Sequence, residues 1–175
     1  MLTENNLLVR VAEQFLEQVF QELAVEERIE VRYRLSGEGN PMQRAFFATT
    51  KEAAGRSVQL GKSRDVYVGV APRLGENGTK AGVALLWALW ADLDLKHGHT
   101  RESRIKQLHK LPCRPSMLVW SGGGWHPYWL LTKPAEGPEE LKRAELVMQR
   151  LAEGLTAILS TTAPRDTKKS AEVPS

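Results

Sequence analysis

An apolar run from residue 83 to residue 91 leads into two aspartates, Asp92 and Asp94, spaced i, i+2. In a β-strand, residues with this spacing lie on the same face. The run therefore predicts a buried central strand over residues 83–95 that carries both carboxylates to one side. Two carboxylates this close repel each other, so a divalent cation is their natural partner, and oxygen ligands favour Mg²⁺ or Mn²⁺ over zinc. A solvated turn is the alternative interpretation of the same pattern.

A second segment, over residues 117–131, is typical of a strand, a glycine turn and a returning strand. The turn consists of Ser121, Gly122, Gly123 and Gly124. Three glycines can point backbone N–H groups at an anion, and His126 just beyond them can hydrogen-bond a phosphate oxygen. A plain hairpin turn would need only one or two glycines. The segment therefore predicts a ligand-binding turn, with a plain hairpin as the alternative.

Together the two segments resemble the archaeo-eukaryotic primase superfamily, and most closely the RepB-like primase-polymerase domains of plasmids and phages. The family's acidic motif, two aspartates alternating with apolar residues, matches residues 90–94. Its histidine motif, often seen as S-G-x-G-x-H-x-Y-W, matches residues 121–129. The strand expected over residues 65–71 looks like the one that precedes the acidic strand in these proteins. The resemblance covers roughly residues 28–160.

The resemblance implies an α+β fold, an RRM-like primase-polymerase core whose mixed or antiparallel sheet is packed with helices. It also implies a DNA primase or polymerase, a nucleotidyltransferase of plasmid or phage replication. Its catalytic residues would be Asp92 and Asp94, holding two Mg²⁺ or Mn²⁺ ions, and His126. Nucleoside triphosphates would be bound by His126, Ser121, Gly122, Gly123, Gly124, Lys96 and Arg73. The other implied partners are single-stranded or primed DNA and a replicative helicase.

One motif of the family is missing from this pattern. A third acid should lie on a strand after the last helix, which is expected to end near Leu159. The one aspartate beyond that point, Asp166, has no apolar run before it. We therefore expect a C-terminally shortened or altered relative with weak catalytic activity.

A basic helix is predicted over residues 100–111, directly after the acidic strand. Its candidate contacts to nucleic acid are Arg101, Arg104, Lys106 and Lys110.

Two other functions stay open. The first is a non-catalytic module that binds single-stranded nucleic acid by stacking bases on exposed tryptophans and tyrosines. The second is a rolling-circle (HUH-type) nicking enzyme, with His97 and His99 on a metal and Tyr128 as the nucleophile. Such sites usually place a bulky apolar residue between the histidines, whereas this chain has a glycine there.

Composition sets wide bounds on these functions. The chain has 175 residues, 42% hydrophobic and 26% charged, with a net charge of +3. These values predict one soluble domain over residues 1–160, with residues 161–175 expected to be a disordered tail. A single cysteine, Cys113, excludes an internal disulfide and fits the reducing cytoplasm. No segment is typical of a signal peptide or is long enough to span a membrane.

Periodicity predicts the other elements. An amphipathic helix is expected over residues 5–23, with a core stripe of Leu8, Val11, Phe15, Val19 and Leu23. A half-buried strand over residues 28–35 would carry Glu30, Arg32 and Arg34 on its outer face, which is solvated or, as the alternative, faces a nucleic-acid phosphate. Further expected elements are a strand at 44–49, a helix at 50–60, a loop at 72–82, a linker at 134–137 and a helix at 138–159.

Overall fold

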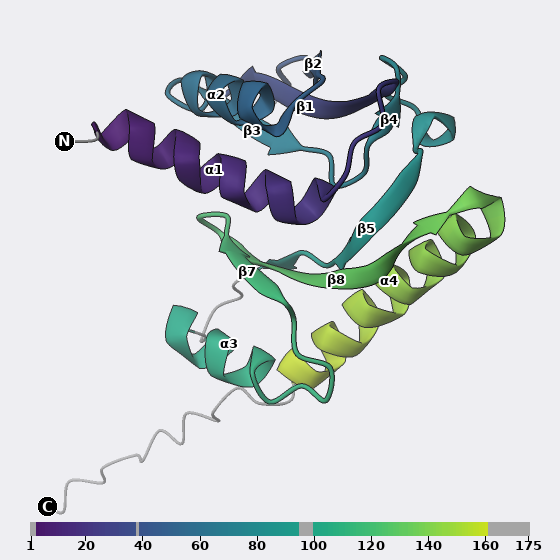
Figure 1. Cartoon of the computed structure of the whole chain (residues 1–175). Coiled ribbons are helices and arrows are strands. Elements are labelled where there is room, and N and C mark those ends of the chain that lie inside the picture. Colours follow the sequence, from purple (N-terminus) through teal and green to yellow (C-terminus); the bar gives the residue numbers. More distant parts are fainter. Residues whose placement is uncertain (1–2, 38, 95–99, 161–175) are drawn as a thin grey trace, which may run out of the picture. The chain divides into compact units, whose positions relative to one another are not determined.

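The computed structural model of the chain describes residues 3–37, 39–94 and 100–160. Over these residues the structure is mixed α+β with antiparallel sheets, so the expected fold class is confirmed at that level (Figure 1). The chain divides into two compact units, residues 1–89 with 129–147, and residues 90–128 with 148–175. Strands β5 and β8 and helix α4 contribute residues to both units.

The first unit begins with α1 (Glu4–Phe20), β1 (Glu27–Leu35), β2 (Gln43–Phe47), α2 (Thr50–Leu60), β3 (Arg64–Val68) and β4 (Arg73–Leu74). A 3₁₀ turn, η1 (Lys80–Gly82), and strand β5 (Leu85–Trp90) follow. The first sheet has the order β2-β1-β3, and β4 also pairs with β1. Helix α2 packs against this sheet and α1 packs against α2 (Figure 1).

Helix α1 begins at its Thr3 cap, whose hydroxyl accepts a hydrogen bond from the Asn6 N–H. The predicted core stripe is wrong for the first half of this helix, because Leu8 and Val11 are exposed. The buried side chains are instead Leu16, Val19 and Phe20. Helical periodicity continues along the whole helix, but burial begins only at Leu16, near its C-terminal end.

Strand β1 follows the predicted alternation with one exception. Ile29 and Val31 are fully buried, and Arg32 on the opposite face is partly exposed. Glu30 shares the face of Arg32, yet it is also fully buried, so the prediction that it is solvated is wrong. The physical reason is a cluster of arginines that covers its carboxylate.

The second unit contains β6 (Leu93–Asp94), α3 (Arg101–Leu108), β7 (Met117–Trp120) and the first part of β8 (Gly124–Glu136). The second sheet has the order β5-β8-β6, and β7 also pairs with β8. The single strand predicted over residues 83–95 is interrupted, because β5 ends at Trp90 and β6 begins at Leu93. Burial on both faces is also wrong: Leu86 and Ala88 are buried, but Trp87 between them is only half-buried.

Strand β8 continues to Glu136, so the linker predicted at 134–137 is a strand end. The long helix is confirmed as α4 (Gly137–Ser160), which buries Ala144 and Leu155. Among the described residues, none of the helices has the length and apolar character needed to cross a bilayer. Lys96, His97, His99 and the tail at 161–175 lie outside the described residues.

Candidate functional site

The two aspartates lie at the start of the short strand β6. Asp92 and Asp94 are exposed, while Ala91 and Leu93 next to them are buried. This alternation places both carboxylates on the same side, as their spacing predicted. The backbone is held there by a hydrogen bond from Ala91 N to the Pro127 carbonyl, at 3.2 Å.

Pairing with β8 brings His126 to the first of these acids. Leu93 lies opposite Trp125 and Asp94 opposite Gly124. Because the strands are antiparallel, the residue before Leu93, Asp92, lies opposite the residue after Trp125, His126. The distance from His126 Nε2 to Asp92 Oδ1 is 3.2 Å.

The surroundings of this pair are aromatic. The Trp90 ring lies 6.0 Å from the His126 ring between centroids. Tyr128, two residues further along β8, is only 5% exposed. Burial raises the pKa of Tyr128 to about 12, and the Asp92 charge adds to the rise. This environment disfavours Tyr128 as the nucleophile of a nicking enzyme, because the buried hydroxyl is poorly accessible to a DNA phosphate and its raised pKa makes the phenolate harder to form.

The glycine turn closes on itself. The Ser121 hydroxyl donates to the Gly124 carbonyl at 3.1 Å and accepts from the Gly124 N–H at 3.2 Å. Gly122 has a φ of +98°, and a Cβ on Gly124 would collide with the Leu93 carbonyl oxygen. Two of the three glycines are thus explained by the hairpin itself, and the Gly124 N–H points back into the turn. The structure therefore favours the plain-hairpin interpretation over the ligand-binding one.

The donor set at the acidic face fits a divalent cation in part. Carboxylate oxygens are the ligands that Mg²⁺ and Mn²⁺ prefer, and Mg²⁺ keeps several waters. Within the described part of the chain, however, no three histidine, cysteine or acidic side chains come together as a metal site. Asp92 and Asp94 therefore provide two ligands at most, with His126 beside the first.

The basic helix lies against aromatic side chains. The Arg101 guanidinium stacks 4.9 Å above Trp120 and 5.2 Å above Trp125, measured to the ring centroids. Trp125 is a neighbour of His126 in β8, so its side chain points to the opposite face of the sheet. Helix α3 therefore contacts the face away from Asp92.

Only part of this helix is available to a ligand. Arg104 is 3% exposed and donates to Gln107, and burial lowers its pKa. Arg104 thus does not fit the predicted set of nucleic-acid contacts. Lys106 and, just beyond the end of α3, Lys110 are exposed, as that prediction requires.

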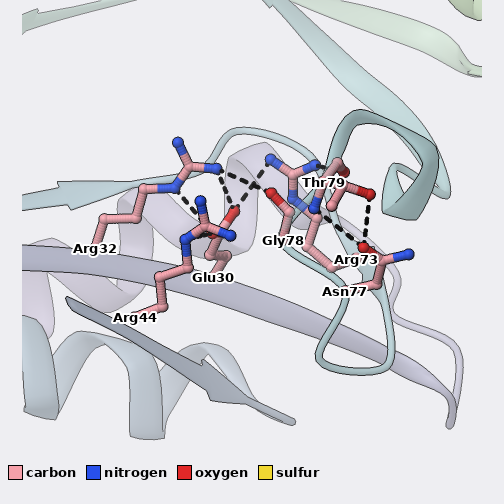
Figure 2. Close-up of polar contacts among 7 residues, drawn as sticks. All are labelled: Glu30, Arg32, Arg44, Arg73, Asn77, Gly78 and Thr79. Carbon is pink, nitrogen blue, oxygen red and sulfur yellow. Dashed lines mark hydrogen bonds and ion pairs between the residues drawn. The ribbon is translucent and has the colours of Figure 1, made fainter. Parts of the chain in front are cut away.

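A second polar cluster, absent from the sequence prediction, lies on the first sheet (Figure 2). Its centre is the fully buried carboxylate of Glu30, and the guanidinium groups of Arg32, Arg44 and Arg73 surround it. We call these four residues the Glu30 cluster. Arg73, which was expected to bind nucleotide, is 11% exposed and pairs with Glu30 at 3.1 Å.

The contacts within the Glu30 cluster are unequal. Arg32 binds the carboxylate with two hydrogen bonds, from Nε at 2.8 Å and from Nη2 at 2.9 Å. Arg73 also donates to the Thr79 carbonyl at 2.9 Å. Arg44 makes only an ion pair from Nε at 3.4 Å, and its side chain is 47% exposed. A Cβ on Gly78 would collide with Arg44, so the loop after β4 packs closely over the cluster.

The charges in the cluster affect one another. The hydrogen bond to Glu30 raises the pKa of Arg32. Burial lowers the pKa of Arg73, with Glu30 opposing this effect and the Arg32 and Arg44 charges adding to it. The one available sequence signal was the alternation of Glu30 and Arg32 on a strand, with Arg44 on the next predicted strand.

Comparison with known proteins does not extend this picture: no family model, no curated protein and no solved structure matches the chain.

Proposed function

We propose that this chain is a nucleotidyltransferase domain of the primase-polymerase type that binds divalent metal and nucleoside triphosphate. The observation that carries the proposal is the acidic face of the second sheet. Asp92 and Asp94 are exposed on one side of it, and His126 lies 3.2 Å from Asp92. The two motifs that resemble the primase superfamily are thus neighbours in the second unit.

In this proposal the two aspartates hold Mg²⁺ or Mn²⁺. A bound ion would neutralise charge on the triphosphate and favour attack by a 3′-hydroxyl. His126 binds a phosphate oxygen of the incoming nucleotide, and its contact with Asp92 fixes the orientation of the imidazole. With only two acids placed, we expect nucleotide and metal binding with slow primer extension, because a poorly positioned metal costs about a hundredfold in rate.

Calorimetric titration with Mn²⁺ tests the metal site. Asp92→Asn and Asp94→Asn should each abolish the binding seen with the unaltered chain, since each removes one of two ligands. Glu102→Gln is the matched control, because Glu102 is an exposed acid in the same unit, on helix α3. Unchanged Mn²⁺ binding in both aspartate variants would overturn the proposal.

Primer extension tests the chemistry. The chain should extend a primed template slowly in Mn²⁺, and Asp92→Asn should remove that activity. Binding of metal and nucleotide with no extension at all would point instead to a non-catalytic module.

A further inference from the structure

The Glu30 cluster holds more positive than negative charge. Three guanidinium groups face one carboxylate, and the described residues contain no second acid within ion-pair distance of them. Like charges directly opposite each other in a sheet are destabilising, yet Arg32 and Arg44 are direct cross-strand partners. Glu30 compensates only part of this repulsion, so an added anion would relieve the rest.

The cluster lies on an accessible part of the sheet. The side chain of Arg32 is 35% exposed and that of Arg44 is 47% exposed, although both contact a carboxylate that is fully buried. Glu30 and the loop at Gly78 therefore hold the guanidinium groups in place, while part of each side chain stays accessible to solvent. An anion that binds there meets groups already in position, which lowers the entropic cost of binding.

An aromatic side chain continues the same row of residues. Tyr67 of β3 is the other cross-strand partner of Arg32, so Arg44, Arg32 and Tyr67 lie in line across three strands. Residues directly opposite in antiparallel strands share a face. Tyr67 is 47% exposed. The row thus offers two cations and one exposed ring side by side on an antiparallel sheet.

We propose that this row, Arg44, Arg32 and Tyr67, is a binding site for single-stranded nucleic acid. The guanidinium groups contact backbone phosphates, and a neighbouring base stacks on Tyr67. Arg44, which makes only a long ion pair to Glu30, can offer its fork to a phosphate, and Arg32, whose Nε and Nη2 bind Glu30, adds its charge and remaining N–H groups. Aromatic rings on a sheet bind bases without regard to their sequence. Arg73 is a positioning residue, since it holds Glu30 and the Thr79 carbonyl from inside the cluster.

The chemistry of the row favours an oligonucleotide over a free nucleotide. A triphosphate alone would use the arginines but would leave Tyr67 exposed, whereas a strand engages both. The site lies within the first unit and uses neither Asp92 nor His126. This inference is therefore independent of the proposed metal site and goes beyond it.

Fluorescence anisotropy with a labelled oligothymidylate, in the presence of a chelator, tests the inference on the full chain. Arg44→Gln should weaken binding about three- to tenfold at low salt. It should also reduce the slope of log affinity against log salt by about 0.7, the value for one phosphate contact on a single strand. Tyr67→Leu should weaken binding about fivefold or more with little change in slope.

The control is Arg56→Gln, which removes the same charge from an exposed position on helix α2. It should leave both affinity and slope close to those of the unaltered chain. Arg44→Lys keeps the charge without the planar fork and should give an intermediate affinity, which guards against an effect of misfolding. Equal binding by Arg44→Gln and Arg56→Gln would overturn the proposal.

Competition separates the possible ligands. Unlabelled oligothymidylate should displace the probe far better than thymidine triphosphate at the same phosphate concentration. If the triphosphate competes equally well, the row is a polyphosphate site and the assignment to nucleic acid is wrong. Because the chelator removes divalent metal, failure here leaves the Mn²⁺ titrations at Asp92 unaffected.

Discussion

His126 Nε2 and Asp92 Oδ1 lie 3.2 Å apart across the pairing of β6 with β8. The two residues come from the two separate motifs, so their contact depends on strand register. An imidazole in this position has one nitrogen directed to a carboxylate, which fixes the ring and leaves the other nitrogen for a ligand.

We expect His126→Ala to weaken nucleoside triphosphate binding while Mn²⁺ binding survives. A hydrogen bond to a charged phosphate contributes about 1.5–3 kcal/mol, so the loss should be roughly ten- to a hundredfold. Calorimetry with Mn²⁺ first and nucleotide second separates the two events. His109→Ala is the control, because His109 is exposed at the end of helix α3. Loss of Mn²⁺ binding in His126→Ala would instead make His126 a metal ligand.

The raised pKa of the buried Tyr128 phenol should make the folded chain less stable at alkaline pH. Its pKa is about 12 in the folded chain, against an ordinary value of 10.0, chiefly because the ring is buried. Between these values the unfolded chain has lost the phenol proton and the folded chain keeps it. The free energy of unfolding should therefore fall as pH rises from 10 to 12, by about 1.4 kcal/mol per unit.

Urea denaturation of the unaltered chain and of Tyr128→Phe across this pH range measures that contribution. The difference in stability between them should change with the predicted slope, and a constant difference would contradict the burial argument. Asp92→Asn offers a second check. It removes the smaller of the two causes and should lower the Tyr128 pKa, seen as tyrosinate absorbance at lower pH.

Glu30→Gln should be one of the most destabilising conservative changes in the chain. It keeps the shape of the side chain but leaves three guanidinium groups without their carboxylate. Removing one partner from a buried ion pair costs about 3–5 kcal/mol, and we expect the lower end here because Arg32 and Arg44 are partly exposed. Chemical denaturation should show this loss for Glu30→Gln.

Asp65→Asn is the comparison for this change. Asp65 pairs with Arg34 at 3.5 Å on the same sheet, but it is partly exposed. We expect its replacement to cost about 1 kcal/mol or less, as for other exposed pairs. Similar losses in the two variants would mean that the burial of Glu30 contributes little.

Local patterns predicted most of the elements. The alternation in β1, the helix at α2 and the hairpin of β7 and β8 follow from side-chain period and turn residues close in sequence. The spacing of Asp92 and Asp94 likewise placed them on one side, because alternation along a strand needs no knowledge of the rest of the fold.

The features that were missed depend on pairing between distant segments. Glu30 is buried only because Arg44 comes from β2 and Arg73 from β4, and no property of β1 alone indicates this. The contact of His126 with Asp92 depends on the register of β6 against β8. Arg104 is a predicted nucleic-acid contact on a basic helix, yet it lies on the buried side of α3.

The neighbouring glycines Gly123 and Gly124 have opposite surroundings. A Cβ on Gly124 would collide with the Leu93 carbonyl oxygen and approach the Asp94 Cα to 3.0 Å, whereas a Cβ on Gly123 meets nothing within 4 Å. The atoms against Gly124 are backbone atoms, so no side-chain rotation relieves the contact. Gly124→Ala should therefore push β6 away from β8 and cost about 1–3 kcal/mol, as other overpacked sites do.

The free energy of unfolding of Gly123→Ala should stay within about 0.5 kcal/mol of that of the unaltered chain. Thermal or urea unfolding of the two variants checks the packing argument without reference to function, and equal stabilities would contradict the close approach of β6.

Mn²⁺ titration of the same proteins then checks the proposed site. Because Gly124 has no ligand atom but lies against the backbone of Asp94, its replacement should weaken Mn²⁺ binding only through the position of that aspartate. Full Mn²⁺ affinity in a destabilised Gly124→Ala would contradict the expected dependence of the metal site on the position of β6.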